Sequence, residues 1–278
     1  MNIKEYLKGK IKNEELKKVR RGFEIIGDVV IVEIPDEIEH LKNLIVQAIL
    51  ARHKNVKTVL RKVGIVDGVY RVAKYEILHG SKTETVAKEF GCKFLVDPTK
   101  VYYSSKLSSE RERIAKMVKD GERVLVMFAG VGPYAIVIAK LAKPAEVVGV
   151  EINPIAVDYF RKNIKINKVE NLVKVYEGDV KEVLPKIEGK FDRIIMPSPK
   201  TAENYVYLIR DKIKKNGWVH YYTFAGEEEE PNLGEKIRNI FKKNGIEVEI
   251  ERIRACGSYA PRVNRYVADV KVLRIHNA

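Results

Sequence analysis

The sequence contains little cysteine and no long apolar run. Its two cysteines, Cys92 and Cys256, do not form a C-x-x-C pair, so we expect neither a disulfide framework nor a metal site. No apolar stretch approaches the roughly 18 residues that a membrane-spanning helix needs. Met1 leads directly into charged residues rather than into a signal peptide. These absences predict a cytoplasmic protein that does not contact a membrane, and we expect it to be a monomer.

Acidic residues are too few to balance the basic ones. The chain has 52 Lys and Arg against 38 Asp and Glu, a net charge of +14. Lysines and arginines on phosphates release counterions, so this excess favours a polyanionic partner. A heat-adapted surface is also rich in charge, and the single glutamine, Gln47, fits that alternative. Heat adaptation raises both signs together, so the surplus itself favours nucleic acid.

The most informative motif is an apolar run that breaks into a glycine turn. Residues 124–128 predict a buried parallel strand, Ala129-Gly130-Val131-Gly132 follows, and residues 134–141 predict a helix. A second predicted strand, residues 146–150, leads to Glu151. This order is that of the first half of a nucleotide-binding α/β unit.

The acids and the glycines of this unit predict the class of ligand. Gly130 and Gly132 allow the backbone to turn sharply and to approach a ligand closely, but the third glycine of a dinucleotide fingerprint is absent. Glu151 suits ribose hydroxyls, and Asp179, after a predicted strand at 173–176, suits an adenine amino group. An adenosine without phosphates fits S-adenosylmethionine better than NAD. For the glycine pair alone, a tight turn that binds no ligand is the alternative.

Asp97-Pro98 marks the predicted boundary between a first domain, residues 1–97, and a second, residues 98–278. The hydrophobic pattern of the first domain predicts short elements: strands within 23–34, a helix at 38–53, and strands at 56–63 and 69–78. We expect an antiparallel sheet with one or two helices, without a cofactor signature. The domain is a candidate RNA-facing module because of its basic residues, although a solvated sheet face explains any single one equally well: Lys54, Lys57, Arg61, Lys62, Arg71, Lys74 and Lys82.

The second domain continues the α/β alternation beyond the glycine motif. Ser109 and Glu112 form a capping-box pattern that predicts a helix at about 110–119. Helix N-termini bind carboxylates, so Ser109 is a candidate for the ligand's carboxylate, with Lys116 on the same face; an ordinary cap and a surface lysine are the alternatives. The remaining predicted elements are a strand at 191–195, a helix at 205–214, a strand at 218–224, a helix at 233–243, strands at 247–253 and 266–274, and a substrate loop at 255–264.

Several segments together resemble the archaeal and eukaryotic enzymes that act on position 37 of tRNA. They include Met-Phe-Ala-Gly-Val-Gly-Pro at 127–133, Glu-Ile-Asn-Pro at 151–154 and Ser-Tyr-Ala-Pro at 258–261, together with residues 21–28 and 97–111. That superfamily contains the guanine-N1 methyltransferase and its paralogue, the wybutosine-pathway aminocarboxypropyltransferase. The resemblance covers nearly the whole chain. It implies a doubly wound α/β sheet of the class I methyltransferase type, preceded by a smaller α+β domain on the RNA side.

Three departures from the methyltransferase pattern favour the second paralogue. Methyltransferases of this family usually have an acid two residues before the Phe of Phe-Ala-Gly, where this chain has Val126. They have Asn-Leu-Pro or a similar motif after the fourth strand, where this chain has Met196-Pro-Ser-Pro199, and an arginine where it has Lys106. Without an acid to hold its amino group, the methionine chain is expected to offer its γ-carbon, instead of its methyl group, to the substrate.

The resemblance and the motifs together give a set of candidate site residues. For catalysis and base positioning they are Lys106, Pro197 and Ser198. For binding S-adenosyl-L-methionine they are Ser109, Lys116, Phe128, Gly130, Gly132, Glu151, Ile152, Asp179 and Val180. Arg262 and Arg265 are candidates for holding phosphates or the base, with solvated surface as the alternative.

Three functions remain open from the sequence. The favoured one is transfer of the 3-amino-3-carboxypropyl group to 4-demethylwyosine at position 37 in the anticodon loop of tRNA(Phe), with release of methylthioadenosine. The nearest alternative is guanine-37 N1-methylation, for which a base near the guanine N1 is expected and none is identified. The third is an RNA-binding protein with a vestigial cofactor fold. The presence of Gly130, Gly132, Glu151 and Asp179 together argues against this last function.

Overall fold

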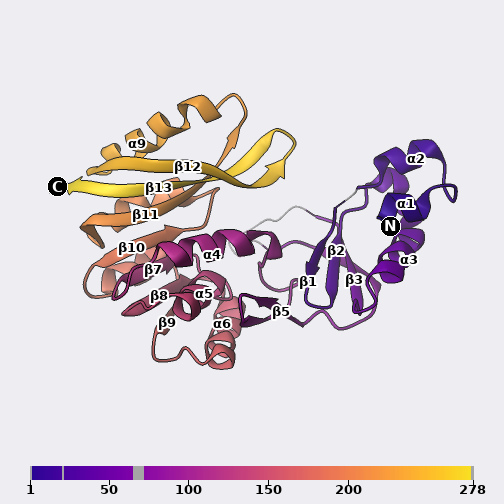
Figure 1. The fold of residues 1–278 in the computed structure, drawn as a ribbon, viewed down its shortest axis with the longest axis horizontal. Coiled ribbons are helices and arrows are strands. Elements are labelled where there is room, and N and C mark those ends of the chain that lie inside the picture. Colours follow the sequence, from indigo (N-terminus) through magenta and orange to yellow (C-terminus); the bar gives the residue numbers. More distant parts are fainter. Residues whose placement is uncertain (1, 21, 65–71, 277–278) are drawn as a thin grey trace. The chain divides into compact units, whose positions relative to one another are not determined.

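The computed structural model describes residues 2–20, 22–64 and 72–276, which fall into two compact units, Met1–Lys106 and Leu107–Ala278 (Figure 1). This division lies later than the expected boundary at Asp97-Pro98. The intervening segment binds back to the first unit, because the Ser105 N–H and the Ser104 hydroxyl donate hydrogen bonds of 2.7 and 2.8 Å to the Glu24 carboxylate.

The first unit is a four-stranded sheet with helices and a separate hairpin. Its helices are α1 (Ile3–Leu7), α2 (Asn13–Lys18), the 3-10 helix η1 (Asp36–Leu41) and α3 (Lys42–Arg52). The sheet has the order β1 (Glu24–Ile26), β2 (Val29–Val32), β3 (Thr58–Lys62) and β4 (Tyr75–His79), and the hairpin is β5 (Thr85–Glu89) with β6 (Cys92–Val96). The strands expected around the Gly27-Asp28 turn are confirmed as β1 and β2.

The fully antiparallel sheet expected for this unit is wrong in one pairing. β2 and β3 run parallel, with Val30 opposite Val59. Helix α3 lies between them in the chain, and a parallel pair needs such a crossover connection. The expected helix at 38–53 also begins later, because its first turn is the 3-10 helix η1.

The second unit is a seven-stranded, mostly parallel sheet with helices on both faces. Its strands are β7 (Arg123–Met127), β8 (Glu146–Glu151), β9 (Val173–Glu177), β10 (Phe191–Met196), β11 (Ile213–Gly226), β12 (Ile246–Ala260) and β13 (Val263–Ile275). Its helical elements are η2 (Ser105–Leu107, shared with the first unit), α4 (Ser108–Met117), α5 (Pro133–Leu141), α6 (Pro154–Asn167), α7 (Val180–Val183), η3 (Leu184–Lys186), η4 (Ala202–Tyr205), α8 (Val206–Ile209), η5 (Glu230–Asn232) and α9 (Leu233–Lys243).

The strand order is β12-β13-β11-β10-β7-β8-β9, with β12 and β13 antiparallel to their neighbours. Leu125 and Met127 pack into a core with residues of α7, α8 and α9, while α4, α5 and α6 cover the other face (Figure 1). The chain proceeds from β7 to β8 and β9 on one side, and then to β10 and β11 on the other. Ligands of open α/β sheets bind at such a reversal, outside the carboxyl ends of the strands. The expected doubly wound fold is confirmed.

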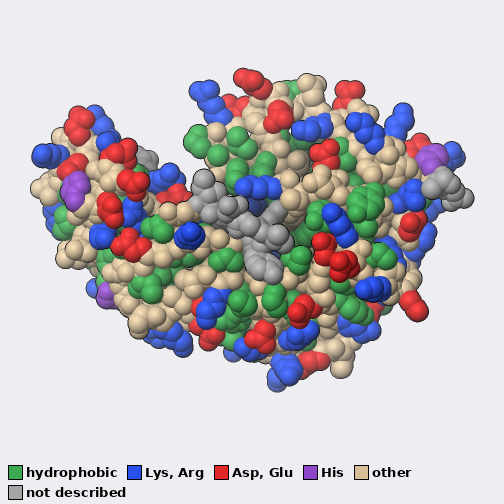
Figure 2. All heavy atoms as spheres, turned by 180° about the vertical axis from the view of Figure 1, so that it is seen from behind, with side chains coloured by type: hydrophobic (Ala, Val, Ile, Leu, Met, Phe, Trp, Pro, Cys, Tyr) green, Lys and Arg blue, Asp and Glu red, His purple; other side chains and the backbone are tan. Residues whose placement is uncertain are grey.

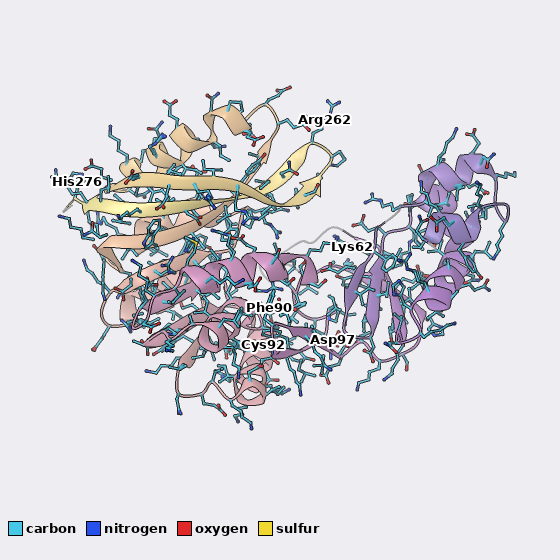
Figure 3. All side chains as sticks on the ribbon, in the orientation of Figure 1. Lys62, Phe90, Cys92, Asp97, Arg262 and His276 are labelled. Carbon is cyan, nitrogen blue, oxygen red and sulfur yellow. The ribbon has the colours of Figure 1, made fainter. Side chains whose placement is uncertain are left out.

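The expected elements of the second unit differ from the structure in two places. The predicted helix at 205–214 is only η4 and α8, because β11 already begins at Ile213. The predicted substrate loop at 255–264 is largely strand. Ala255 pairs with Tyr266 and Ser258 with Asn264, so β12 and β13 form a long hairpin that turns at Pro261-Arg262. Figure 3 shows Arg262 at the turn of this hairpin and His276 beyond its other end.

Candidate cofactor and substrate site

The loop after β7 contains three residues with left-handed backbone, each separated from the next by one ordinary residue. Phe128 has a φ of 55°, Gly130 of 57° and Gly132 of 89°. Glycine adopts such angles readily, whereas a bulky residue such as Phe128 is strained there by roughly 1–3 kcal/mol. The Phe128 ring packs edge-on against Tyr205, with the ring centroids 5.0 Å apart. Backbone strain of this kind clusters at functional sites, and here it lies at the carboxyl end of the central strand.

Glu151, the last residue of β8, holds this loop in place. Its Oε2 accepts a hydrogen bond from the Gly130 N–H at 2.7 Å, and its Oε1 accepts one from the Asn153 N–H at 2.8 Å. An ionised carboxylate can accept about four hydrogen bonds, so these two bonds do not by themselves prevent Glu151 from accepting from ligand hydroxyls. Asn153 was missed by the sequence analysis. It is the N-cap of α6, and the signal was Asn153-Pro154, a capping residue followed by proline at the first helical position.

Gly132 is required for packing within the protein. A Cβ at this position would lie 2.1 Å from the ring of Phe160, which is fully buried on α6. Gly132 was expected to let the backbone turn sharply and to approach a ligand closely. Its φ of 89° fits the sharp turn, and the structure adds a second reason for glycine, because the space that a side chain would take is filled by Phe160. Gly132 therefore shapes the site by allowing α5 and α6 to approach closely.

Asp179 lies next to Glu151 because their strand ends are joined. The Gly178 N–H donates a hydrogen bond to the Glu151 carbonyl at 2.9 Å. Asp179 is the N-cap of α7, where its Oδ1 accepts from the Lys181 N–H at 2.9 Å. Asp179 and Ile152 are both partly exposed. Two carboxylates beside an apolar side chain fit an adenosine, since hydroxyl and amino donors find acceptors and the flat base finds apolar surface.

Val180 and Ser198 are more buried than a direct ligand contact requires. Val180 is 3% exposed and belongs to the main core. Ser198 is 1% exposed, and its hydroxyl is hydrogen-bonded to that of Thr201 at 2.5 Å. Its carbonyl accepts from the Thr201 and Ala202 N–H groups. Ser198 therefore shapes the loop after β10, while Pro197 stays partly exposed and accessible to a base.

Val126 is fully buried in the centre of the sheet. It lies in register with Gly149 of β8 and Ile195 of β10. Leu125 and Met127 face the α7–α9 side, so Val126 faces the α4–α6 side by the alternation of a strand. The position at which the resemblance leads us to expect an acid in a methyltransferase is therefore occupied here by an apolar core residue.

Lys106, Ser109 and Lys116, the three candidates before β7, do not form one site. The capping-box prediction is wrong, because α4 begins at Ser108 and its N-cap, Leu107, makes no side-chain cap; Ser109 is exposed in the first turn. Lys116 lies in the last turn, paired with Glu112 at 2.8 Å. The next residue, Met117, accepts a hydrogen bond from Arg193, near the amino end of β10. Lys116 is thus at the sheet edge opposite the glycine loop, and we leave it out of the site. Lys106 is exposed in η2, and its role remains a prediction.

A buried chain of polar side chains, also missed from the sequence, connects the glycine loop to α4. The Tyr134 hydroxyl donates to that of Tyr222 at 3.0 Å, and the Tyr222 hydroxyl donates to Glu110 at 2.8 Å. Burial raises the pKa of both tyrosines, so both remain protonated donors. Because Tyr134 follows Gly132-Pro133, this chain fixes the start of α5 relative to the first turn of α4.

The polar chain continues through charged groups beneath α4. Arg113 binds both Glu110 and Asp269, and Asp269 accepts from His220 Nδ1 at 2.7 Å. His220 Nε2 lies 2.7 Å from Arg193 Nη1. An arginine only donates, so His220 is neutral with its proton on Nδ1. Burial lowers the pKa of His220, as does the Arg193 charge, against the opposing effect of Asp269. Burial alone would raise the pKa of Asp269, but His220 and Arg113 hold it well below its usual value.

The basic residues expected to face RNA in the first unit divide into two groups. Arg61 is 5% exposed and binds Asp36, Glu39 and Glu76, so it stabilises the fold and does not face RNA. Lys57 pairs with Asp28 at 3.3 Å, and Arg71 lies outside the described residues. The exposed members are Lys54, Lys57, Lys74 and Lys82, with Lys62 partly exposed. Figure 2 shows basic and acidic side chains interspersed over the visible face, without a single basic patch.

Two further findings concern the described residues alone. No helix in residues 2–20, 22–64 and 72–276 has the length and apolarity to cross a membrane. Over the same ranges, no group of three or more His, Cys, Asp or Glu side chains is placed to hold a metal ion.

The sheet order, the strained glycine loop and the acids at the ends of β8 and β9 define an α/β fold of the class I methyltransferase type. Comparison with known families specifies it further. Residues 85–250 match the TRM5/TYW2 methyltransferase domain, and residues 3–83 match the TYW2 N-terminal domain. The chain belongs to the TRM5/TYW2 family.

The relatives differ from one another in the activity that their names state. The chain is 42% identical to tRNA (guanine(37)-N(1))-methyltransferase Trm5b of Pyrococcus abyssi, over 90% of this chain and 74% of that protein. It is 35% identical to tRNA 4-demethylwyosine(37)-methyltransferase Taw21 of Saccharolobus solfataricus, over 91% and 92%. It is 33% identical to tRNA(Phe) (4-demethylwyosine(37)-C(7)) aminocarboxypropyltransferase of Methanocaldococcus jannaschii, over 91% and 98%.

Solved structures agree with this assignment. The crystal structure of Trm5b from Pyrococcus abyssi superposes with a TM-score of 0.83 at 39% identity, over 95% of this chain and 79% of that one. The structure of P. horikoshii TYW2 in complex with MeSAdo superposes with a TM-score of 0.79 at 31% identity, over 98% of each chain.

Proposed function

We propose that this protein transfers the 3-amino-3-carboxypropyl group of S-adenosylmethionine to 4-demethylwyosine at position 37, in the anticodon loop of tRNA(Phe). The observation that carries the proposal is Val126, an apolar residue buried in the centre of the sheet, at the position where the resemblance leads us to expect an acid in a methyltransferase. The match of residues 3–83 to the TYW2 N-terminal domain supports the same activity. So do the relatives that are named as aminocarboxypropyltransferases.

Different residues of the chain bind different parts of S-adenosylmethionine. Glu151 holds the glycine loop and accepts from the ribose, while Asp179 accepts from the adenine amino group, with Ile152 beside them. Phe128 and the loop set the direction in which the methionine portion leaves the pocket. Because no carboxylate at position 126 holds its amino group, that portion is free to present its γ-carbon.

The transfer is a displacement at that γ-carbon. Carbon 7 of the tricyclic base forms the new C–C bond while the bond from the γ-carbon to sulfur breaks, and the electron pair stays on sulfur in methylthioadenosine. The base then loses the proton of carbon 7 to solvent and regains its aromatic character. Pro197, partly exposed at the end of β10, offers a rigid apolar surface against which the base stacks.

Methyl transfer is the second candidate, and a specific observation favours it. Two of the relatives described above, including the one at 42% identity, are named as methyltransferases, and one of them acts on 4-demethylwyosine itself. The two candidates use the same cofactor and the same tRNA position. They differ in which carbon attached to sulfur is attacked, and guanine-37 N1-methylation also uses a different base as the nucleophile.

Cofactor labelled either in the methyl group or in the carboxyl carbon distinguishes them. Incubation with tRNA(Phe) carrying 4-demethylwyosine should incorporate the carboxyl label and release methylthioadenosine, while a guanosine-37 transcript should be a poor substrate. Incorporation of the methyl label, with S-adenosylhomocysteine as the small product, establishes the methyltransferase instead. A protein that binds S-adenosylmethionine and tRNA but incorporates neither label contradicts both candidates.

A further inference from the structure

Two aromatic rings stack at the end of the β12–β13 hairpin, outside the cofactor site. Phe224 of β11 and Tyr259 of β12 lie with their ring centroids 4.0 Å apart and their planes 26° apart. Tyr259 is 49% exposed, whereas Phe224 is partly buried. Neither ring belongs to the main core of the unit. The stack therefore places a large apolar surface in contact with solvent, in a fixed orientation.

Each ring of this stack also has a cation next to it. The Lys200 ammonium lies 5.4 Å from the centre of the Tyr259 ring, and the Arg265 guanidinium lies 5.7 Å from that of Phe224. Because the two rings cover each other on one side, the order is arginine, phenylalanine, tyrosine, lysine. Lys200 is exposed at the end of this order, and a surface cation–π contact is worth only about 0.5–1 kcal/mol. Lys200 is thus the member of this stack that a ligand displaces most easily from its neighbour, Tyr259.

The stack lies beyond the carboxyl edge of the sheet, where the reacting base is expected. Tyr221 of β11 is in register with Met196, the last residue of β10. Phe224 is three residues further along the same strand, which is about 10 Å at the rise of a β-strand. Lys200 comes from the loop that begins with Pro197 and Ser198. Phe224 and Lys200, which contact the two faces of Tyr259, are therefore held by a strand and a loop that extend beyond the candidate site.

We propose that Tyr259 is a stacking platform for an unpaired nucleobase of the substrate tRNA that neighbours the reacting base. The base replaces Lys200 on the open face of Tyr259, and the released ammonium pairs with a backbone phosphate. Stacking of a base on an aromatic side chain is stronger than the cation–π contact that it replaces. Phe224 holds the Tyr259 ring, so little side-chain freedom is lost when the base binds. This inference rests on the proposed tRNA substrate, but not on which group is transferred.

Binding measurements on the full chain test the platform. The probe is tRNA(Phe) that carries 4-demethylwyosine at position 37 and 2-aminopurine at the nucleotide on either side of it, titrated at fixed salt. In the wild type and in Tyr259→Phe we expect 2-aminopurine at one of the two positions to be quenched by stacking. In Tyr259→Leu, which keeps an apolar side chain but lacks a flat ring, the quenching should disappear and the Kd for tRNA should rise roughly 5- to 100-fold. S-adenosylmethionine affinity should not change.

Tyr207 provides the matched control, since it is a tyrosine of similar exposure, 48%, on α8. Tyr207→Leu should bind the labelled tRNA as the wild type does. Lys200→Met should lower the log–log salt slope of binding by about one unit while quenching persists. Unchanged quenching in Tyr259→Leu, or an equal loss of affinity in Tyr207→Leu, overturns the platform.

The transfer assay distinguishes the failure of this inference from that of the proposed function. If Tyr259→Leu binds and modifies tRNA normally, only the platform is wrong. If the wild type binds no tRNA at all, the proposed function and the platform fail together.

Discussion

Replacing Glu151 removes a carboxylate that serves both the protein and the ligand. Its two oxygens accept the Gly130 and Asn153 N–H groups at 2.7 and 2.8 Å. Hydrogen bonds to charged groups make a net contribution of about 1.5–3 kcal/mol each, so the two together contribute about 3–6 kcal/mol to holding the loop in its binding conformation. A tenfold change in affinity corresponds to about 1.4 kcal/mol. We therefore expect Glu151→Ala to weaken S-adenosylmethionine binding at least tenfold.

The amide variant gives the sharper test of this geometry. Glutamine has one acceptor end and one donor end, so in Glu151→Gln its NH2 group must face either the Gly130 or the Asn153 N–H. Two donors then meet, and the loop moves. We expect Glu151→Gln to lose nearly as much affinity as Glu151→Ala, although the two side chains have almost the same shape.

Isothermal titration with S-adenosylmethionine measures both variants, and urea unfolding checks that each remains folded. Glu177 is the matched control, because it is in register with Glu151 on β9 but is exposed and pairs only loosely, at 3.5 Å, with Arg161. Glu177→Gln should bind as the wild type does. Wild-type affinity in Glu151→Gln would refute the argument that both oxygens must be acceptors.

Three further outcomes are expected. Gly132→Ala should lower the urea midpoint more than Gly91→Ala. Both substitutions cost roughly 1–2 kcal/mol, because alanine is unfavourable in the left-handed conformation, but only the alanine at position 132 clashes with Phe160. Equal losses of stability in the two variants would contradict the clash. Burial lowers the pKa of His220 from its ordinary 6.5, so the unfolded chain takes up a proton at this residue more readily than the folded one. The free energy of unfolding should therefore decline as the pH falls below 6.5, with no such loss above it. His220→Gln should flatten this decline, and an equally steep decline in the variant refutes the argument. The Kd for tRNA should rise steeply with salt, with a log–log slope of several units, whereas a salt-independent affinity argues against phosphate contacts.

The sequence determined the order of elements in the second unit and much of the cofactor site. Hydrophobic periodicity and turn residues are local signals, so the strand, glycine turn, helix, strand and Glu151 could be located from residues 124–151. The assignment of Glu151 and Asp179 to one ligand also followed, because each lies at or just after the end of a parallel strand, and such ends meet at one edge of a sheet. Helix α9 was predicted at its observed bounds, 233–243, since its apolar stripe is regular.

Long-range packing decided what local patterns could not. The parallel pairing of β2 with β3 depends on where α3 returns the chain. The hairpin formed by β12 and β13 depends on a register with several irregularities, which no period-2 pattern specifies across residues 255–264. The Ser109 capping box failed because α4 begins two residues earlier than expected, with its N-cap at Leu107.

Tertiary structure alone also decided the roles of single residues. Gly132 faces Phe160, 28 positions later in the chain, and Arg61 is buried among three acids. Glu110, Tyr222 and Asp269 lie far apart in sequence, and only the packing of α4 on the sheet brings them together. A residue's type limits the chemistry that it can perform. Its neighbours, which the fold supplies, determine whether that chemistry serves a ligand or the protein itself.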